Sequence, residues 1–211
     1  MSELDAQRLA VLVHEVRSPV AALSAIAETV ADPSLDASAR VELVRLAVSA
    51  GESVQRIVTD IAVASIRFEE IAPGGLVRDA AAAAVLRGDR VEVDIAAELP
   101  LIRGDPQRLR QALDNLIANA VVHSGSDDPV VVRGVADVAL RISVSDAGVG
   151  IAPEEQDSIF DVGVRLGTDS GGSGIGLALT RAIVEGHGGA LTVSSTPGDG
   201  ASFTIVLPLG R

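Results

Sequence analysis

The chain has 211 residues, carries a formal net charge of −12 at pH 7 and contains no cysteine. The acidic balance argues against general nucleic-acid binding, which needs a basic surface, and against docking on anionic membranes. The absence of cysteine excludes disulfides and thiolate metal sites. Hydrophobic residues make up 47% of the chain but aromatic residues only 1%, so the cores must be built from aliphatic side chains. Neither a signal peptide nor an apolar run of the ~18 residues needed to cross a bilayer is visible.

The first part of the chain predicts two long amphipathic helices. Residues 3–31 place apolar side chains at helical spacing, and a second such pattern runs from Val44 to Ser65 near heptad spacing. Asp32, Pro33 and Ser34 form a breaker between them. A two-helix hairpin cannot bury its whole apolar stripe alone, whereas two copies forming a four-helix bundle can. We therefore expect a homodimer.

Composition changes near residues 72–75, where a Pro-Gly-Gly string follows the second helix, so we predict domains at 1–70 and 71–211. Beyond this boundary the patterns mix helix and strand, and Asp105 before Pro106 is typical of a helix N-cap. Because strands and helices do not alternate regularly, we expect an α+β sandwich. The predicted helices cover residues 76–86, 106–123 and 176–185, and the predicted strands cover residues 90–95, 130–132, 138–144, 190–193 and 203–207.

A histidine in the first predicted helix has the neighbours that a nucleophile needs. His14 lies off the apolar stripe, Glu15 follows it directly, and Ser18 sits one turn further on roughly the same face. A reactive imidazole needs an exposed nitrogen and a group that takes its proton, for which Glu15 is the candidate. Pro19 lacks an amide donor and should bend or loosen the helix at this point. A solvated surface histidine is the alternative.

Two asparagines on one helix face form the second constellation. Asn115 and Asn119 are four residues apart, so their side chains project from the same side of the predicted helix. Amide oxygens are suitable ligands for Mg²⁺, which prefers hard oxygen donors and keeps several waters. Either residue alone is equally compatible with a surface or capping asparagine.

Two glycine-rich segments follow. Asp146 ends a predicted strand, and Gly148 and Gly150 behind it permit close backbone approach or unusual dihedral angles. A carboxylate in that place can accept a hydrogen bond from an exocyclic amine. The second segment carries Gly172, Gly174, Gly176 and Leu177 at the start of a predicted helix, where backbone amides attract phosphate oxygens. Its spacing fits neither a Walker A loop nor a dinucleotide fingerprint.

In this order, the histidine, the asparagine pair and the two glycine segments resemble the catalytic core of sensor histidine kinases of two-component systems, from about residue 7 to residue 208. The resemblance implies a dimerisation and phosphoacceptor hairpin followed by an ATP-binding domain of the Bergerat (GHKL) type. It also implies ATP and Mg²⁺ as cofactors and the receiver domain of a response regulator as partner. It places the chain in the cytoplasm, on its own or as the cytoplasmic portion of a longer membrane receptor.

The resemblance also implies residue roles. His14 would be phosphorylated with Glu15 as base, and Ser18 would stand where such kinases usually carry Thr or Asn, a position associated with dephosphorylation of the regulator. In the nucleotide site, Asn119 would coordinate Mg²⁺, Asn115 would line the site and Asp146 would read the adenine amino group. The glycines would surround the nucleotide, and we interpret residues 161–171 as a mobile lid in which Arg165 contacts the terminal phosphate.

The sequence departs from the family pattern at three positions. Val122 and His123 stand where the family often has a basic residue and an aromatic residue, and Gly163 replaces the second aromatic of the lid entry, although Phe160 is kept. Two alternatives stay open, the first of them because of the changes at Val122 and Gly163. One is a degenerate, non-catalytic dimeric phosphotransfer or scaffold module. The other is a related Bergerat-fold ATPase, although those enzymes use a glutamate where Asn115 stands.

Overall fold

The computed structural model describes residues 3–32, 35–64, 66–124, 128–161, 164 and 174–209; within these ranges, the side chains of residues 3–15, 55, 56 and 58–64 are not described. Contacts between residues divide the chain into two compact units, Met1–Ile61 and Ala62–Arg211. Within the described ranges, no helix combines the length and the apolar character that a membrane-spanning segment requires.

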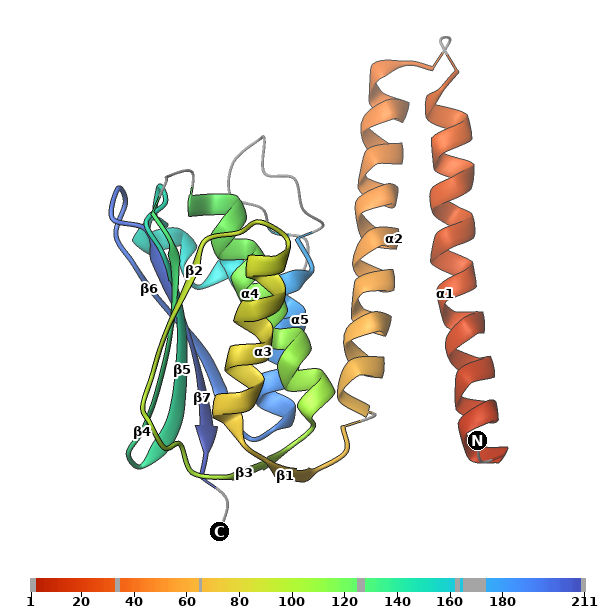
Figure 1. Ribbon diagram of the computed structural model, residues 1–211. Coiled ribbons are helices and arrows are strands. Elements are labelled where there is room, and N and C mark those ends of the chain that lie inside the picture. Colours follow the sequence, from red (N-terminus) through yellow and green to blue (C-terminus); the bar gives the residue numbers. More distant parts are fainter. Residues whose placement is uncertain are drawn as a thin grey trace. The chain divides into compact units, whose positions relative to one another are not determined.

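The first unit is a helical hairpin, as the two apolar patterns predicted (Figure 1). Helix α1 covers Glu3–Val30 and contains Pro19, and α2 covers Ala37–Ala64. The predicted pattern for α2 began only at Val44, but the helix starts a full turn and more earlier. Asp36 explains the early start, because its Oδ1 accepts a hydrogen bond from the Ala39 amide at 2.7 Å and caps the first turn.

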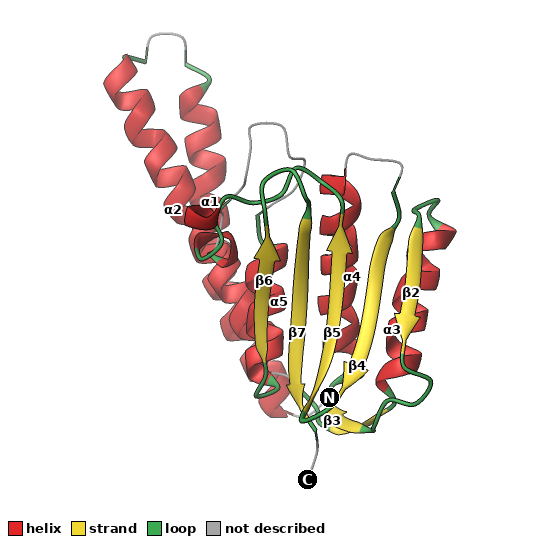
Figure 2. Cartoon of the chain, turned by 90° about the vertical axis from the view of Figure 1, so that its left-hand side faces the viewer, coloured by secondary structure: helices red, strands yellow, loops and turns green. Residues whose placement is uncertain are grey.

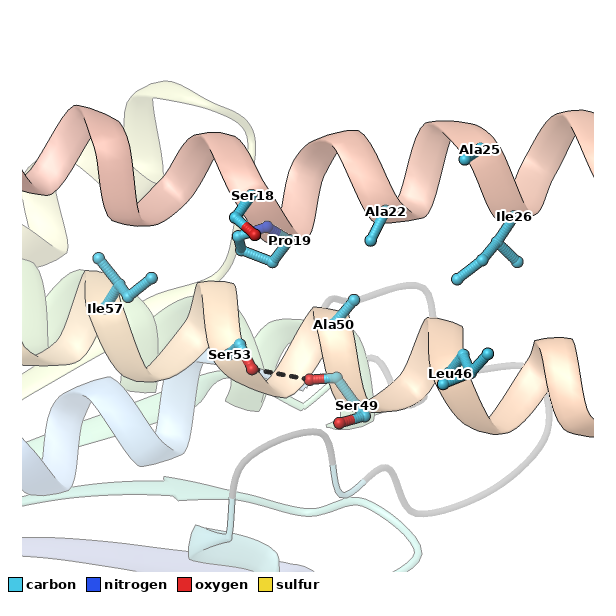
Figure 3. Close-up of a pocket in the computed structure, with 10 residues that line it drawn as sticks. All are labelled: Ser18, Pro19, Ala22, Ala25, Ile26, Leu46, Ser49, Ala50, Ser53 and Ile57. Atoms are coloured by element: carbon cyan, nitrogen blue, oxygen red, sulfur yellow. Dashed lines mark hydrogen bonds between the residues drawn. The ribbon is translucent and has the colours of Figure 1, made fainter.

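Small side chains line a groove between the two helices (Figure 3). Ala22 and Ala25 lie on α1, and Ser49, Ala50 and Ser53 lie on α2. The Ser53 hydroxyl donates to the Ser49 carbonyl oxygen at 3.0 Å, which satisfies this polar group within its own helix. The groove therefore presents a mainly apolar surface.

The second unit contains a five-stranded sheet with three helices on one face (Figures 1 and 2). The strand order is β2-β4-β5-β7-β6, with β2 and β4 parallel and all other neighbours antiparallel. The strands are β2 (Val91–Ile95), β4 (Val130–Ala136), β5 (Ala139–Asp146), β6 (Ala190–Ser195) and β7 (Ala201–Pro208), and the helices are α3 (Pro73–Leu86), α4 (Pro106–Ser124) and α5 (Gly176–Gly186).

The core of this unit lies between the sheet and the helices. Every second residue of β5 and β7 is buried, with Leu140, Ile142 and Val144 facing inward on β5 and Phe203 and Ile205 on β7. The alternate positions carry serine, threonine and other side chains that are only half-buried. This period of two is the pattern of a sheet with one covered face, and it confirms the predicted α+β architecture.

Four short elements escaped prediction because their length gives no periodic signal. Strands β1 (Glu69–Ile71) and β3 (Ile102–Gly104) pair antiparallel in a separate two-stranded sheet. Two 3₁₀ turns, η1 (Pro153–Glu155) and η2 (Ser158–Phe160), lie between β5 and α5. The η2 turn places the Phe160 ring edge-on against Phe203, with the ring centroids 6.3 Å apart.

Candidate nucleotide site

Helix α4 carries the asparagine pair and is held from its first turn. Asp105 caps it, because its Oδ1 accepts hydrogen bonds from the amides of Gln107 at 3.0 Å and Arg108 at 3.1 Å, which confirms the predicted N-cap. One side of α4 is buried in the core, through Leu109, Ala112, Leu113, Leu116, Ile117 and Ala120. Asn115 and Asn119 are half-buried beside this apolar side, one helical turn apart.

The start of helix α5 lies against Asn115. The Asn115 side-chain amide donates to the Gly176 carbonyl oxygen at 3.4 Å, and a Cβ added to Gly176 would stand 3.9 Å from Asn115 Cγ. Gly174 adopts a positive φ of 70° immediately before the helix. Leu177 is half-buried and packs against the hydrophobic core, so it anchors the first turn of α5. The N-terminus of α5 is thereby fixed next to the asparagine face.

Asp146 at the end of β5 has one anchored and one unengaged carboxylate oxygen. Oδ1 accepts hydrogen bonds from the amides of Gly148 at 2.9 Å and Ala201 at 3.3 Å. Among the described residues, Oδ2 has no hydrogen-bond partner. The half-buried carboxylate is therefore fixed in orientation and retains an acceptor that a ligand can use.

Gly148 and Gly150 are required by their backbone surroundings. A Cβ at position 148 would overlap the carbonyl oxygen of His123, at the end of α4. Gly150 has φ +72°, and a Cβ there would overlap the carbonyl oxygen of Thr196. The predicted close approach and unusual dihedral angle are confirmed. As a result, the turn after Asp146 packs directly on the C-terminal end of α4.

Three successive turns of α4 therefore connect the parts of the site. Asn115 contacts the start of α5, the carbonyl of His123 contacts the turn after Asp146, and Asn119 lies between them, about 6 Å along the axis from each. The structure thus brings together Asn115, Asn119, Asp146, Gly148, Gly150, Gly174, Gly176 and Leu177 in the second unit.

Other predicted site residues are elsewhere or outside the description. His14 and Glu15 lie in the α1 backbone, but their side chains are outside the described residues, and Ser18 is exposed on α1. Arg165 and Gly172 are outside the described residues, as are Gly163 and most of the proposed lid. Val122 is 56% exposed on α4 and contributes no charge to the site.

The donor set of the site fits a cation that keeps most of its own water. Among the described side chains, no group of three or more His, Asp or Glu is arranged to hold a metal ion. The Asn119 side chain has no hydrogen-bond partner among the described residues, so its amide oxygen is available. A single neutral oxygen beside bound phosphates suits Mg²⁺, which is held in proteins through few protein ligands.

The sequence did not predict the polar groups that hold the elements of this site in place. His187 is buried with 5% of its surface exposed, and its Nε2 accepts a hydrogen bond from the Asp105 amide at 2.9 Å. The Ala201 amide, which anchors Asp146, was also not foreseen. The only signal for His187 is its position before Gly188 and Gly189 at the end of a helix, which resembles an ordinary C-cap.

Comparison with known proteins connects this geometry to a family. Residues 104–211 match the family described as histidine kinase-, DNA gyrase B- and HSP90-like ATPase. The adaptive-response sensory kinase SasA of Prochlorococcus marinus is 33% identical over 222 residues, which cover 98% of this chain and 58% of that protein. The sensor histidine kinase ZraS of Klebsiella oxytoca is 29% identical over 212 residues, covering 94% and 45%.

A solved structure gives the same result. The crystal structure of full-length ShkA in complex with AMPPNP has a TM-score of 0.64 and 26% identity, and the match covers 97% of this chain and 47% of that one. The chain belongs to the histidine kinase-, DNA gyrase B- and HSP90-like ATPase family, and its homology to histidine kinases over nearly its whole length identifies it as a sensor histidine kinase catalytic core with an ATP-binding domain. The resemblance predicted from the sequence is confirmed. The chain spans about half the length of these relatives.

Proposed function

We propose that this chain uses ATP to phosphorylate its own His14 and passes the phosphoryl group to an aspartate on the receiver domain of a response regulator. The observation that carries the proposal is the arrangement on α4. Asn115 and Asn119 lie on α4, and the turn after Asp146 packs on the C-terminal end of the same helix. The N-terminus of α5 contacts Asn115. Full-length ShkA, to which the chain is similar, was solved with the ATP analogue AMPPNP.

Asp146 is the proposed adenine contact. Its Oδ1 is held by two backbone amides, so its Oδ2 points in a fixed direction and can accept a hydrogen bond from an exocyclic amine. Guanine presents a carbonyl oxygen in place of the adenine amine, and two acceptors facing each other repel. This site therefore selects ATP over GTP.

The phosphates are the proposed ligands of the middle of α4, around Asn115 and Asn119, and of the start of α5. The amides at the start of α5, beside Gly174 and Gly176, attract phosphate oxygens because they have no partner within the helix, and Gly172 is a further proposed contact of the phosphates. Asn119 would hold the Mg²⁺ with its water shell there, and Asn115 would line the site. The ion when bound supplies charge neutralisation for phosphoryl transfer. Arg165 is the proposed contact of the terminal phosphate.

His14 is the proposed nucleophile. An imidazole nitrogen of His14 attacks the terminal phosphorus of ATP, the bond from that phosphorus to the bridging oxygen breaks, ADP leaves, and the imidazole proton passes to Glu15. In the second step the phosphorus–nitrogen bond breaks as an aspartate oxygen of the regulator attacks. Ser18 is exposed on the same helix and is the candidate for positioning water in the reverse, dephosphorylating role.

A homodimer formed through the helical hairpin is part of the proposal. Val41, Val44 and Val48 are 54–56% exposed and recur at helical spacing on α2. The groove between α1 and α2 is lined largely by Ala, Ser and Ile side chains, which allow further helices to approach closely. Both surfaces are apolar areas that a second hairpin can cover in a four-helix bundle.

The test is to incubate the purified chain with Mg²⁺ and ATP labelled at the γ-phosphate, beside His14→Ala and Asn119→Ala variants. The proposal expects label that is stable in base, labile in acid and absent from both variants, and that moves to a receiver domain when a matching one is added. Label that persists in His14→Ala would exclude His14 as the acceptor. His14→Ala is also expected to bind nucleotide normally, whereas Asn119→Ala is expected to lose Mg²⁺-dependent affinity.

A degenerate scaffold is the second candidate, and one observation favours it. Val122 is a well-exposed apolar residue on α4 at a position where the family often has a basic side chain. Calorimetric titration of the unaltered chain with Mg·ATP decides between the two functions. Binding supports the kinase, whereas absence of both binding and label identifies the scaffold.

A further inference from the structure

Two polar contacts join helices α4 and α5, one at each end of α5; on α4 they lie at the N-cap and at the middle of the helix. At the nucleotide end, the Asn115 side chain donates to the Gly176 carbonyl oxygen at 3.4 Å. At the other end, the Asp105 amide donates to His187 Nε2 at 2.9 Å. These contacts are separated by ten residues on α4 and eleven on the α5 side, about 15 Å of helix in each case. The helices are therefore antiparallel, and the stretches of α4 and α5 between the two polar contacts have nearly the same length.

The Asp105–His187 contact is buried, and its polar atoms are paired. The exposed fraction is 8% for Asp105 and 5% for His187. His187 Nδ1 lies 2.7 Å from the Ile183 carbonyl oxygen, so Nδ1 carries the proton and Nε2 is the acceptor for the Asp105 amide. Replacing His187 by an apolar residue would leave the Asp105 amide buried without an acceptor, which is costly.

The same two residues hold the chain just before β1. Asp105 Oδ2 accepts a hydrogen bond from the Arg67 amide at 2.9 Å, while its Oδ1 caps α4. The Phe68 ring lies against the imidazole of His187, with centroids 5.3 Å apart. Residues 67 and 68 are thus attached to the start of α4 and the end of α5 at once.

We propose that Asp105 and His187 are positioning residues for the nucleotide site, which transmit the position of the segment 66–68 to the Asn115–Gly176 contact. The inference rests on the proposed nucleotide-binding function of that site. Because α4 and α5 are rigid along their length, displacement of α5 at His187 also displaces Gly176 against Asn115. Nucleotide binding beside the Asn115–Gly176 contact and the ordering of residues 66–68 are then coupled, and each affects the other by the same factor.

The experiment compares His187→Leu, which removes the acceptor, with His187→Gln, which retains one. Val77→Ala is the matched control, because it destabilises a fully buried position of α3, outside both helices. The full chain is titrated calorimetrically with Mg·ADP, and the Asn115 side-chain amide signals are followed by NMR without nucleotide. Amide hydrogen exchange at Arg67 is then measured with and without Mg·ADP.

We expect His187→Leu to weaken Mg·ADP binding at least fivefold and to shift the Asn115 side-chain signals, whereas His187→Gln and Val77→Ala stay within twofold. Mg·ADP should slow exchange at Arg67 in the unaltered chain and not in His187→Leu. Unchanged Asn115 signals in His187→Leu would overturn the inference, as would an equal loss of affinity in Val77→Ala. If no variant binds nucleotide, the proposed function fails, but the Asn115 signals still decide the coupling.

Discussion

Replacement of Gly148 by alanine tests whether the turn after Asp146 is fixed by its packing on α4. The added Cβ would lie 2.9 Å from Asp146 Oδ1 and would overlap the His123 carbonyl oxygen outright. That second atom belongs to a helix backbone and cannot rotate away, so the turn and the end of α4 must separate. Overpacking of this kind costs about 1–3 kcal/mol, and loss of the Gly148–Asp146 hydrogen bond adds about 1 kcal/mol.

We therefore expect Gly148→Ala to lower the free energy of unfolding of the second unit by about 3 kcal/mol, which for a unit of this size is a fall in Tm of roughly 6–12 °C. Urea and thermal unfolding followed by far-UV circular dichroism measure it. Gly75→Ala is the matched control, because a Cβ at position 75 meets nothing within 4 Å and the residue lies in helix α3. A Gly148→Ala variant as stable as the Gly75→Ala variant would refute the packing argument.

Three further predictions concern other parts of the chain. Gly176→Ala should leave the free energy of unfolding equal or up to ~1 kcal/mol higher, because the nearest atom to the new Cβ is 3.9 Å away. Any loss of Mg·ADP affinity measured by calorimetry then reports direct contact between this position and the nucleotide. A lower Tm would contradict this expectation. Asp105→Asn should flatten the fall in stability that urea titrations show below about pH 5. Burial raises the pKa of Asp105, but the amides of Arg67, Arg108 and Gln107 and the charge of Arg108 outweigh it, so the folded-state pKa lies below its usual range near ~3.9. The stabilisation is therefore complete above the unfolded-state pKa and is lost as pH falls through the folded-state pKa. An unchanged slope would argue against that assignment. Val48→Glu should convert the proposed dimer to a monomer in light-scattering chromatography, whereas Arg45→Glu, an exposed charge reversal on the same helix, should not.

Much of the architecture could be predicted because long elements bury one side. The strands of the sheet alternate buried and half-buried residues along β5 and β7, and α4 has its buried residues on one side. Periodicity therefore located these elements, with Asp105 and Pro106 marking the start of α4. The α2 start was placed too late because Asp36 acts through one local hydrogen bond, which carries no period. Strands β1 and β3 have three residues each, too few for a pattern to emerge.

The residue types of the candidate site could be predicted from the sequence, but the buried polar contacts that hold them in place could not. Asn115 and Asn119 could be placed on one face because helical spacing is fixed, and Gly148 and Gly150 because glycine marks unusual backbone. The contact between Asp105 and His187 joins residues 82 positions apart and depends on how two helices pack. No local pattern encodes such a contact, so only the folded structure reveals it.

The place of β7 in the sheet has a consequence for how the chain acquires its structure. Strand β7 lies between β5 and β6, and it pairs with both along nearly its whole length, from Ala201 to Pro208. Until that late segment has left the ribosome, β5 has a neighbour on one side only and β6 has none in the sheet. The second unit must therefore complete its sheet after synthesis of residue 208, by closing long loops at a cost in chain entropy. The helical hairpin joins two helices that are adjacent in the sequence, so it can form much earlier.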